Sequence, residues 1–110
     1  MAYNTELVDR LREIIAVEGD VITEKKMFGG YTFLYHGKMT VGVMQDDLLV
    51  RVVPEKMEAM LARPGVRTMD FTGRVMKEFV RVSTDDTISD ATLTEWVTLG
   101  LEHAKRKLGE

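Results

Sequence analysis

The 110-residue chain contains no cysteine, only two prolines and only two histidines. Without cysteine it can form no disulfide bond, thiolate metal site or cysteine nucleophile. It also lacks the run of about 18 apolar residues that a membrane-spanning helix needs, and its amino terminus lacks the apolar segment of a secretory signal. These absences favour a cytoplasmic protein without membrane contact. The length fits one domain over residues 1–110.

The scarcity of histidine also argues against the common catalytic centres. Nucleophilic catalysis needs a histidine that carries the proton, but His36 falls in a predicted turn and His103 on the solvent side of a predicted helix. The pairs Asp46–Asp47 and Asp85–Asp86 fall at predicted turns, where aspartate bonds the local backbone. No metal-binding motif is present. We therefore expect no metal and no cofactor, and we favour a non-catalytic protein, although an enzyme stays an alternative.

The spacing of apolar residues predicts a helix near each end of the chain and a short one between them. The first begins at a cap on Asn4 or Thr5 and ends at Gly19. Pro54 suits the first position of a helix over residues 54–62, because that position needs no N–H. Pro64–Gly65 ends this second helix.

The last predicted helix is capped by Asp90 or Thr92. Its buried stripe consists of Leu93, Val97 and Leu101. Beside this stripe, Trp96, Gly100 and Ala104 allow another element to approach closely. The basic run at residues 105–107 suits the carboxyl end of the helix dipole.

Between the first two helices, residues 24–52 read as strands. Tyr31, Phe33 and Tyr35 alternate with other residues, which is typical of one strand face packed against a helix. His36–Gly37 predicts a two-residue hairpin turn, after which Met39, Val41 and Val43 are expected to share one face. Residues 66–75 are expected to form a loop that leads into a strand over residues 76–82.

Strands grouped apart from helices predict an α+β fold rather than alternating α/β units. The connections are too short to return a parallel strand, so the sheet is expected to be antiparallel. We expect two layers, with an α-β(3–4)-α-β(1–2)-α order and the helices packed on one face of the sheet.

Two features suggest a contact surface. Five basic residues face two acidic ones between Arg63 and Arg81, although the whole chain has a formal charge of −3. Such a cluster is either a solvated surface or a docking site for an acidic partner. Gly29–Gly30 at the start of a strand indicates either a close backbone crossing or an exposed edge. Residues 26–33 also partly match the RNA-binding consensus, which keeps a nucleic-acid-binding module as an alternative.

Several of these segments resemble the TfoX N-terminal domain family. The resemblance rests on Lys26-Met27-Phe28-Gly29-Gly30, His36-Gly37-Lys38-Met39, Leu48–Val52, Met69–Arg74 with Met76-Lys77, and Leu93 with Trp96-Val97. It covers nearly the whole chain, with Val75 standing where the resemblance leads us to expect proline. It implies a two-layer domain similar to secretion-chaperone-like folds, in the bacterial cytoplasm. Longer members act in the regulation of natural competence.

The resemblance and the missing catalytic groups favour a regulatory protein-interaction domain. We expect its partner surface to include Phe28, Gly29 and Gly30 together with Arg74 and Lys77. The partner is either another protein or a second copy of the chain. A nucleic-acid-binding module that uses residues 63–81 and a small-ligand binder are the alternatives.

Overall fold

The computed structural model describes residues 3–18, 21–27, 29–71, 73–85 and 87–110. Within these ranges the elements are α1 (Thr5–Glu18), β1 (Ile22–Met27), β2 (Gly30–Tyr35), β3 (Lys38–Met44), β4 (Asp47–Arg51), α2 (Pro54–Leu61), β5 (Val66–Phe71), β6 (Arg74–Ser83) and α3 (Asp90–Lys107). The strands form one antiparallel sheet in the order β1-β2-β3-β4-β6-β5.

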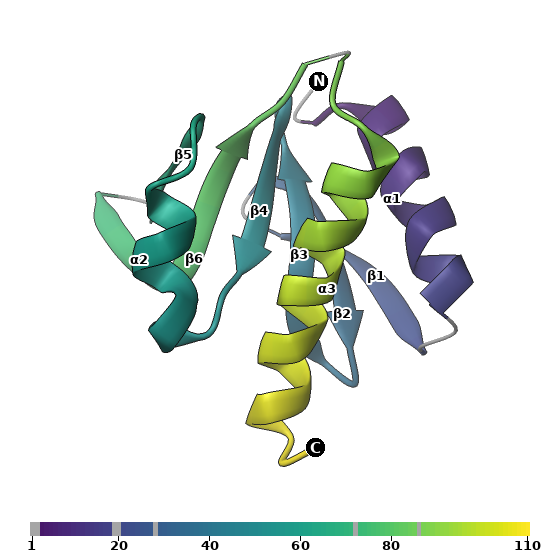
Figure 1. Ribbon diagram of the computed structural model, residues 1–110. Coiled ribbons are helices and arrows are strands. Elements are labelled where there is room, and N and C mark those ends of the chain that lie inside the picture. The colour runs from purple at the N-terminus through teal and green to yellow at the C-terminus, as the bar shows by residue number, and fades with distance from the viewer. Residues whose placement is uncertain (1–2, 19–20, 28, 72, 86) are drawn as a thin grey trace.

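All three helices lie on one face of the sheet (Figure 1). Helix α3 crosses β3 and β4, α1 packs beside α3, and α2 lies over β5 and β6. The expected α+β fold, with helices on one face of an antiparallel sheet, is therefore confirmed. None of the helices described has the length and apolar character needed to cross a bilayer.

Most of the predicted helix starts and turns are confirmed. Asn4 caps α1 by accepting a hydrogen bond from the Leu7 N–H at 3.1 Å, and Pro54 occupies the first turn of α2. His36 and Gly37 both have positive φ, at 48° and 81°, as a two-residue hairpin turn requires. The predicted stop at Gly19 lies outside the described residues.

The predicted cap of α3 was wrong. Ser89, not Asp90 or Thr92, has the extended backbone of a cap, and its hydroxyl accepts a hydrogen bond from the Thr92 N–H at 3.1 Å. Asp90 is already the first helical residue. There its charge favours the positive end of the helix dipole without capping it.

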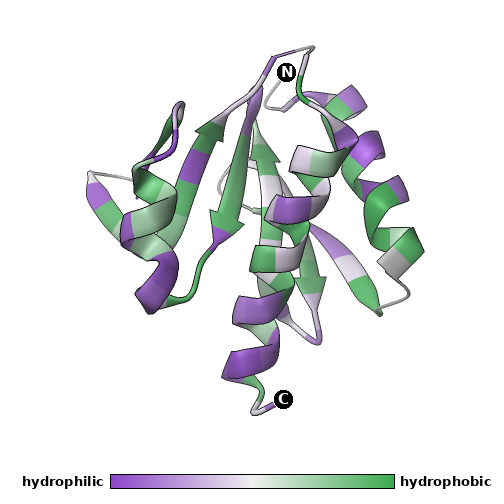
Figure 2. Ribbon diagram, in the orientation of Figure 1, coloured by the Kyte–Doolittle hydropathy of each residue, from purple (hydrophilic) through white to green (hydrophobic). Residues whose placement is uncertain are grey.

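The main core lies between the sheet and the helices. The predicted stripe of α3 is buried, and the alternate residues Val41 and Val43 of β3 face it. Figure 2 shows apolar residues along the strands, and polar residues on the helices and in the turns. The fully buried side chains of this core include Leu11, Phe33, Val41, Val43, Leu48, Val50, Leu93, Trp96 and Val97.

A second, smaller cluster occupies the opposite face of the sheet and corrects the expectation for Met39. Between the pairs Phe33–Val41 and Leu34–Met39, Thr40 has no partner on β2. This extra residue is a bulge, and it turns Met39 away from Val41 and Val43. Met39 instead packs with Leu49, Met69 and Phe79.

The loop expected over residues 66–75 is largely a strand. Residues 66–71 form β5, which pairs with β6. Between the pairs Thr68–Val80 and Met69–Met76, β6 carries three residues that have no partner on β5. Within β5, Val66 packs against the main core and Met69 belongs to the second cluster, so its apolar residues do not repeat on one face. The sequence therefore lacks the two-residue alternation from which a strand is recognised, and the sequence pattern missed β5.

Helix α3 rests directly on the backbone of β3 at Gly100. A Cβ atom at Gly100 would lie 2.5 Å from the Thr40 carbonyl oxygen and 2.8 Å from its carbon. The expected close approach beside Trp96 and Ala104 is therefore confirmed. Thr40 is the residue that bulges from β3, so the bulge and the glycine meet at the same point.

We expect Gly100→Ala to lower the free energy of unfolding by roughly 1–3 kcal/mol, measured by urea denaturation. Alanine favours a helix by about 1 kcal/mol over glycine, but its methyl group would collide with backbone atoms that cannot rotate away. Thr98→Ala, on the exposed side of the same helix, is the control and should be close to neutral. A Gly100→Ala protein at least as stable as the wild type would contradict this packing.

Candidate functional site

The residues expected to form one partner surface lie at two separate places. Phe28 lies outside the described residues. Gly29, with φ of 75°, belongs to the β1–β2 turn, and Gly30 follows it at the start of β2. Arg74 and Lys77 are exposed on β6, near the β5–β6 hairpin at the opposite end of the strands. Strands β3 and β4 lie between these two places.

Gly30 is explained by packing. A Cβ atom at this position would lie 2.2 Å from the Val43 carbonyl oxygen. The backbones of β2 and β3 therefore approach each other too closely for a side chain, which corresponds to the close crossing that a glycine pair in a strand suggests.

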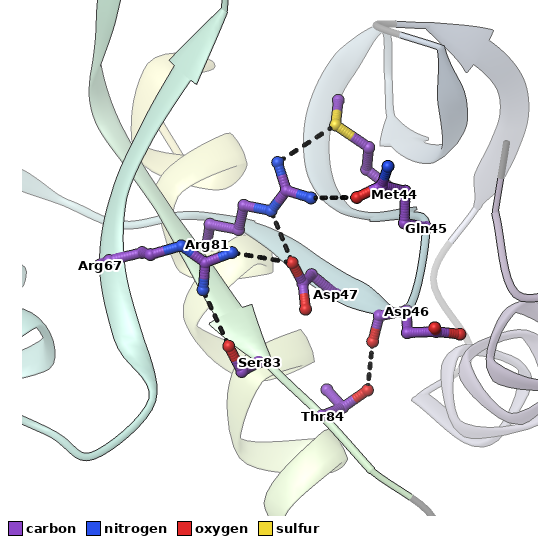
Figure 3. Close-up of polar contacts among 8 residues, drawn as sticks. All are labelled: Met44, Gln45, Asp46, Asp47, Arg67, Arg81, Ser83 and Thr84. Atoms are coloured by element: carbon purple, nitrogen blue, oxygen red, sulfur yellow. Dashed lines mark hydrogen bonds and ion pairs between the residues drawn. The ribbon is translucent and has the colours of Figure 1, made fainter.

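Most arginines of the basic segment have structural partners. Asp47 accepts hydrogen bonds from Arg81 Nε at 2.7 Å and from Arg67 Nη2 at 2.9 Å (Figure 3). Arg67 and Arg81 sit opposite each other on β5 and β6, so Asp47 relieves the repulsion between two like charges. Arg63 pairs with Glu95 and stacks on the Trp96 ring.

Arg74 and Lys77 differ from these arginines. Neither forms a hydrogen bond or an ion pair with another of the residues that the structure describes, and both side chains are exposed. Between them, the Val75 side chain is 62% exposed. The basic segment therefore offers one free surface, the β5–β6 hairpin.

The aromatic strand is not available for stacking on nucleic-acid bases. Phe33 and Tyr35 are buried in the main core, and Tyr31 packs against that core while its hydroxyl donates to Glu24 at 2.7 Å. The expectation that this stripe faces a helix is confirmed.

Two hollows have the size of a small-ligand site. One of about 470 Å³ lies between the start of α1 and the β6–α3 loop. Several polar groups around it already have partners, because Arg10 pairs with Asp90 at 2.6 Å and Asn4 donates to Asp46 at 3.1 Å. A smaller cavity of about 310 Å³ lies at the carboxyl end of α3, and its polar groups are less well satisfied.

His103 forms one wall of the smaller cavity. It was expected on the solvent side of α3, but this was wrong, because its side chain is only 3% exposed. It lies three residues after Gly100, so the close contact of α3 with β3 brings it onto the sheet. Its Nε2 is 2.9 Å from Glu78 Oε1 and 3.3 Å from Arg51 Nη2.

Glu78 reaches His103 because of an unusual backbone conformation. It lies among the three β6 residues that have no partner on β5, and its φ is 62°. A non-glycine residue in this region costs about 1–3 kcal/mol, and such outliers concentrate at functional sites. The Glu78 carbonyl accepts a hydrogen bond from the Val52 N–H at 3.0 Å, which ties the bulge to the end of β4.

Arg51 is the last residue of β4, next to this bulge. Its guanidinium carbon lies 4.3 Å from the centre of the Phe79 ring, over which it stacks. Its Nε atom is buried and has no hydrogen-bond partner among the residues that the structure describes. Buried donors are nearly always satisfied in folded proteins, so this atom is unusual.

The charges of these three residues follow from burial and hydrogen bonding. Burial lowers the pKa of His103 below its ordinary value of 6.5, so the ring is neutral at pH 7. A carboxylate can only accept, so the Nε2 of His103 carries the proton and donates it to Glu78. This hydrogen bond lowers the pKa of Glu78 and keeps it ionised. Burial also lowers the pKa of Arg51, but a guanidinium stays charged.

Cations and apolar side chains line this cavity together. No group of three or more potential metal ligands converges among the residues described. The cavity presents the cations Arg51, Lys38 and Lys107 beside the apolar side chains of Leu34 and Met39.

His103 and Arg51 were not among the expected site residues. A signal for His103 exists in the sequence, because Trp96, Gly100, His103 and Lys107 recur at helical spacing and so share one side of α3. No comparable signal exists for Arg51 or Glu78, which meet only because β4 pairs with β6.

Comparison with known proteins identifies a family. The family model described as the TfoX N-terminal domain matches residues 14–104, most of the chain. In the corresponding comparisons with curated proteins and with solved structures, no match was found.

We expect acid to destabilise the fold through His103. Because its pKa is lowered in the folded state, the unfolded chain takes up the proton first as the pH falls. The free energy of unfolding should therefore hold its full value above about pH 6.5 and decline below it. Denaturant titrations between pH 7.5 and 5 measure this decline, a window above the range in which Glu78 takes up a proton.

His103→Gln should flatten this pH dependence, because glutamine can still donate to Glu78 but does not titrate. His36→Gln, in the exposed β2–β3 turn, is the matched control and should keep the wild-type slope. The same slope in the His103→Gln and wild-type proteins would contradict a buried neutral His103.

We expect Asp47→Ala to lower the free energy of unfolding by roughly 1–3 kcal/mol, measured by thermal or urea denaturation. The Asp47 side chain is only 17% exposed and joins two arginines that would otherwise repel each other. Asp70→Ala removes an exposed carboxylate from β5 and should change stability by less than about 0.5 kcal/mol. Equal effects of the two substitutions would show that Asp47 does not link the strands.

Proposed function

The chain belongs to the TfoX N-terminal domain family, and we propose that it is a regulatory domain that acts by binding another protein rather than by catalysis. The partner surface is the exposed β5–β6 hairpin, where Arg74, Val75 and Lys77 present two cations beside an apolar side chain. The partner therefore offers carboxylates next to an apolar group.

The observation that carries this proposal is the unequal use of cations on β5 and β6. Arg67 and Arg81 are held by Asp47, whereas Arg74 and Lys77 have no partner among the described residues and point into solvent. Positive charge beside an exposed Val75 supports docking of an acidic protein segment, because charge steers the encounter and apolar burial supplies affinity. Gly29 and Gly30 keep structural roles in this proposal, in the β1–β2 turn and its tight crossing.

The test is affinity capture from a nuclease-treated bacterial lysate with the immobilised domain, followed by mass spectrometry. Arg74→Glu/Lys77→Glu reverses the charge of the hairpin and should abolish recovery of the partner. Lys25→Glu/Lys26→Glu makes the same charge change at two exposed lysines of β1 and should leave recovery unchanged. Circular dichroism confirms that both variants are folded.

Two results would contradict the proposal. Equal recovery of the same proteins by the wild type and the hairpin variant would exclude this surface. Recovery that depends on the hairpin in an untreated lysate, and that is lost from the nuclease-treated lysate, would indicate nucleic-acid binding through residues 63–81 instead.

A further inference from the structure

Arg51 carries a charge without enough hydrogen-bond acceptors. Stacking on Phe79 fixes the plane of its guanidinium, so its N–H groups point along fixed directions in that plane. Nε finds no acceptor. Nη2 lies 3.3 Å from His103 Nε2, but that nitrogen already carries the proton donated to Glu78 and cannot accept a second one.

Glu78 does not complete the coordination of Arg51. Its carboxylate accepts from His103 at 2.9 Å and lies 3.9 Å from Lys107 Nζ. Among the residues that the structure describes, no hydrogen bond joins Glu78 to Arg51. The guanidinium is thus half-buried and lacks the oxygen atoms that normally surround a buried arginine.

The cavity beside Arg51 has the size and lining of a small-ligand site. Its volume of about 310 Å³ falls within the usual range for such sites. Lys38 comes from the β2–β3 hairpin and Lys107 from the last turn of α3, so cations approach from two further elements. No aspartate or glutamate is among the described residues that line it, and Leu34 and Met39 supply apolar surface.

From these contacts we propose that this cavity binds a small organic anion whose carboxylate or phosphate head is held by Arg51. Two oxygens of such a head match two parallel N–H groups of a guanidinium. Because Nε is buried, the head binds through the outer nitrogens Nη1 and Nη2. Lys38 and Lys107 add attraction as point charges, and the apolar part of the ligand lies against Leu34 and Met39. The site is independent of the β5–β6 hairpin surface proposed above.

The experiment is a titration followed by amide NMR spectra of the ¹⁵N-labelled chain. The probes are hexanoate, hexyl phosphate and 1-hexanol, which share an alkyl tail and differ in the head. Either anion should shift the amide signals of Gly37, Lys38, Arg51 and His103, and the alcohol should not. The anion that binds more tightly identifies the head.

Arg51→Met keeps much of the side-chain volume and should weaken anion binding by at least about tenfold. Lys107→Ala, at a more exposed position, should weaken anion binding less than Arg51→Met does. It replaces Arg51→Met in the test if the Arg51→Met protein does not fold. Lys26→Ala is the control. Lys26 is exposed on β1 and pairs with Tyr31, which packs against the main core on the sheet face away from Met39. Its removal should leave the affinity unchanged.

Three results would overturn the proposal. Hexanol could bind as tightly as the anions, which would make the site merely apolar. The anions could leave these four amide signals unmoved. The Lys107→Ala and Lys26→Ala proteins could also lose affinity equally, which would mean that only the overall charge of the chain attracts the anion.

Discussion

The contact between Gly100 of α3 and the Thr40 carbonyl of β3 determines how the two layers fit together. A helix can approach a strand this closely only where it carries no side chain, and the bulge at Thr40 brings the carbonyl to that point. One turn further along α3, the same approach buries His103 against the end of β4. The contact therefore sets the packing of the core and also the geometry of the cavity beside Arg51.

Charged side chains in this fold serve two different purposes. On the sheet face opposite the helices, Asp47 joins Arg67 to Arg81 and holds β4, β5 and β6 in register (Figure 3). At the carboxyl end of α3, Arg51 is confined by Phe79 and His103 without a matching acceptor. The first arrangement is internally satisfied and so stabilises the sheet. The second leaves Arg51 Nε without an acceptor among the residues that the structure describes, which distinguishes it from a structural ion pair.

The sequence predicted the features that depend on neighbouring residues. His36–Gly37 forms the expected turn because both residues accept positive φ, and the alternation of Phe33 and Tyr35 marks a strand face that α1 and α3 cover. Features that depend on register were missed. The bulge at Thr40 displaced Met39, because it inserts a residue that breaks the period of two. Strand β5 was missed because its apolar residues Val66 and Met69 lie on opposite faces of the sheet. The cavity also escaped prediction, because Arg51 and Glu78 come together only through the pairing of β4 with β6.

Docking of α3 on β3 buries a neutral His103, whose Nε2–H donates to Glu78. The most direct measurement is a long-range ¹H–¹⁵N correlation spectrum of the His103 ring at pH 7. We expect a neutral ring that is protonated on Nε2 and unprotonated on Nδ1. A charged ring, or a neutral ring protonated on Nδ1, would contradict it.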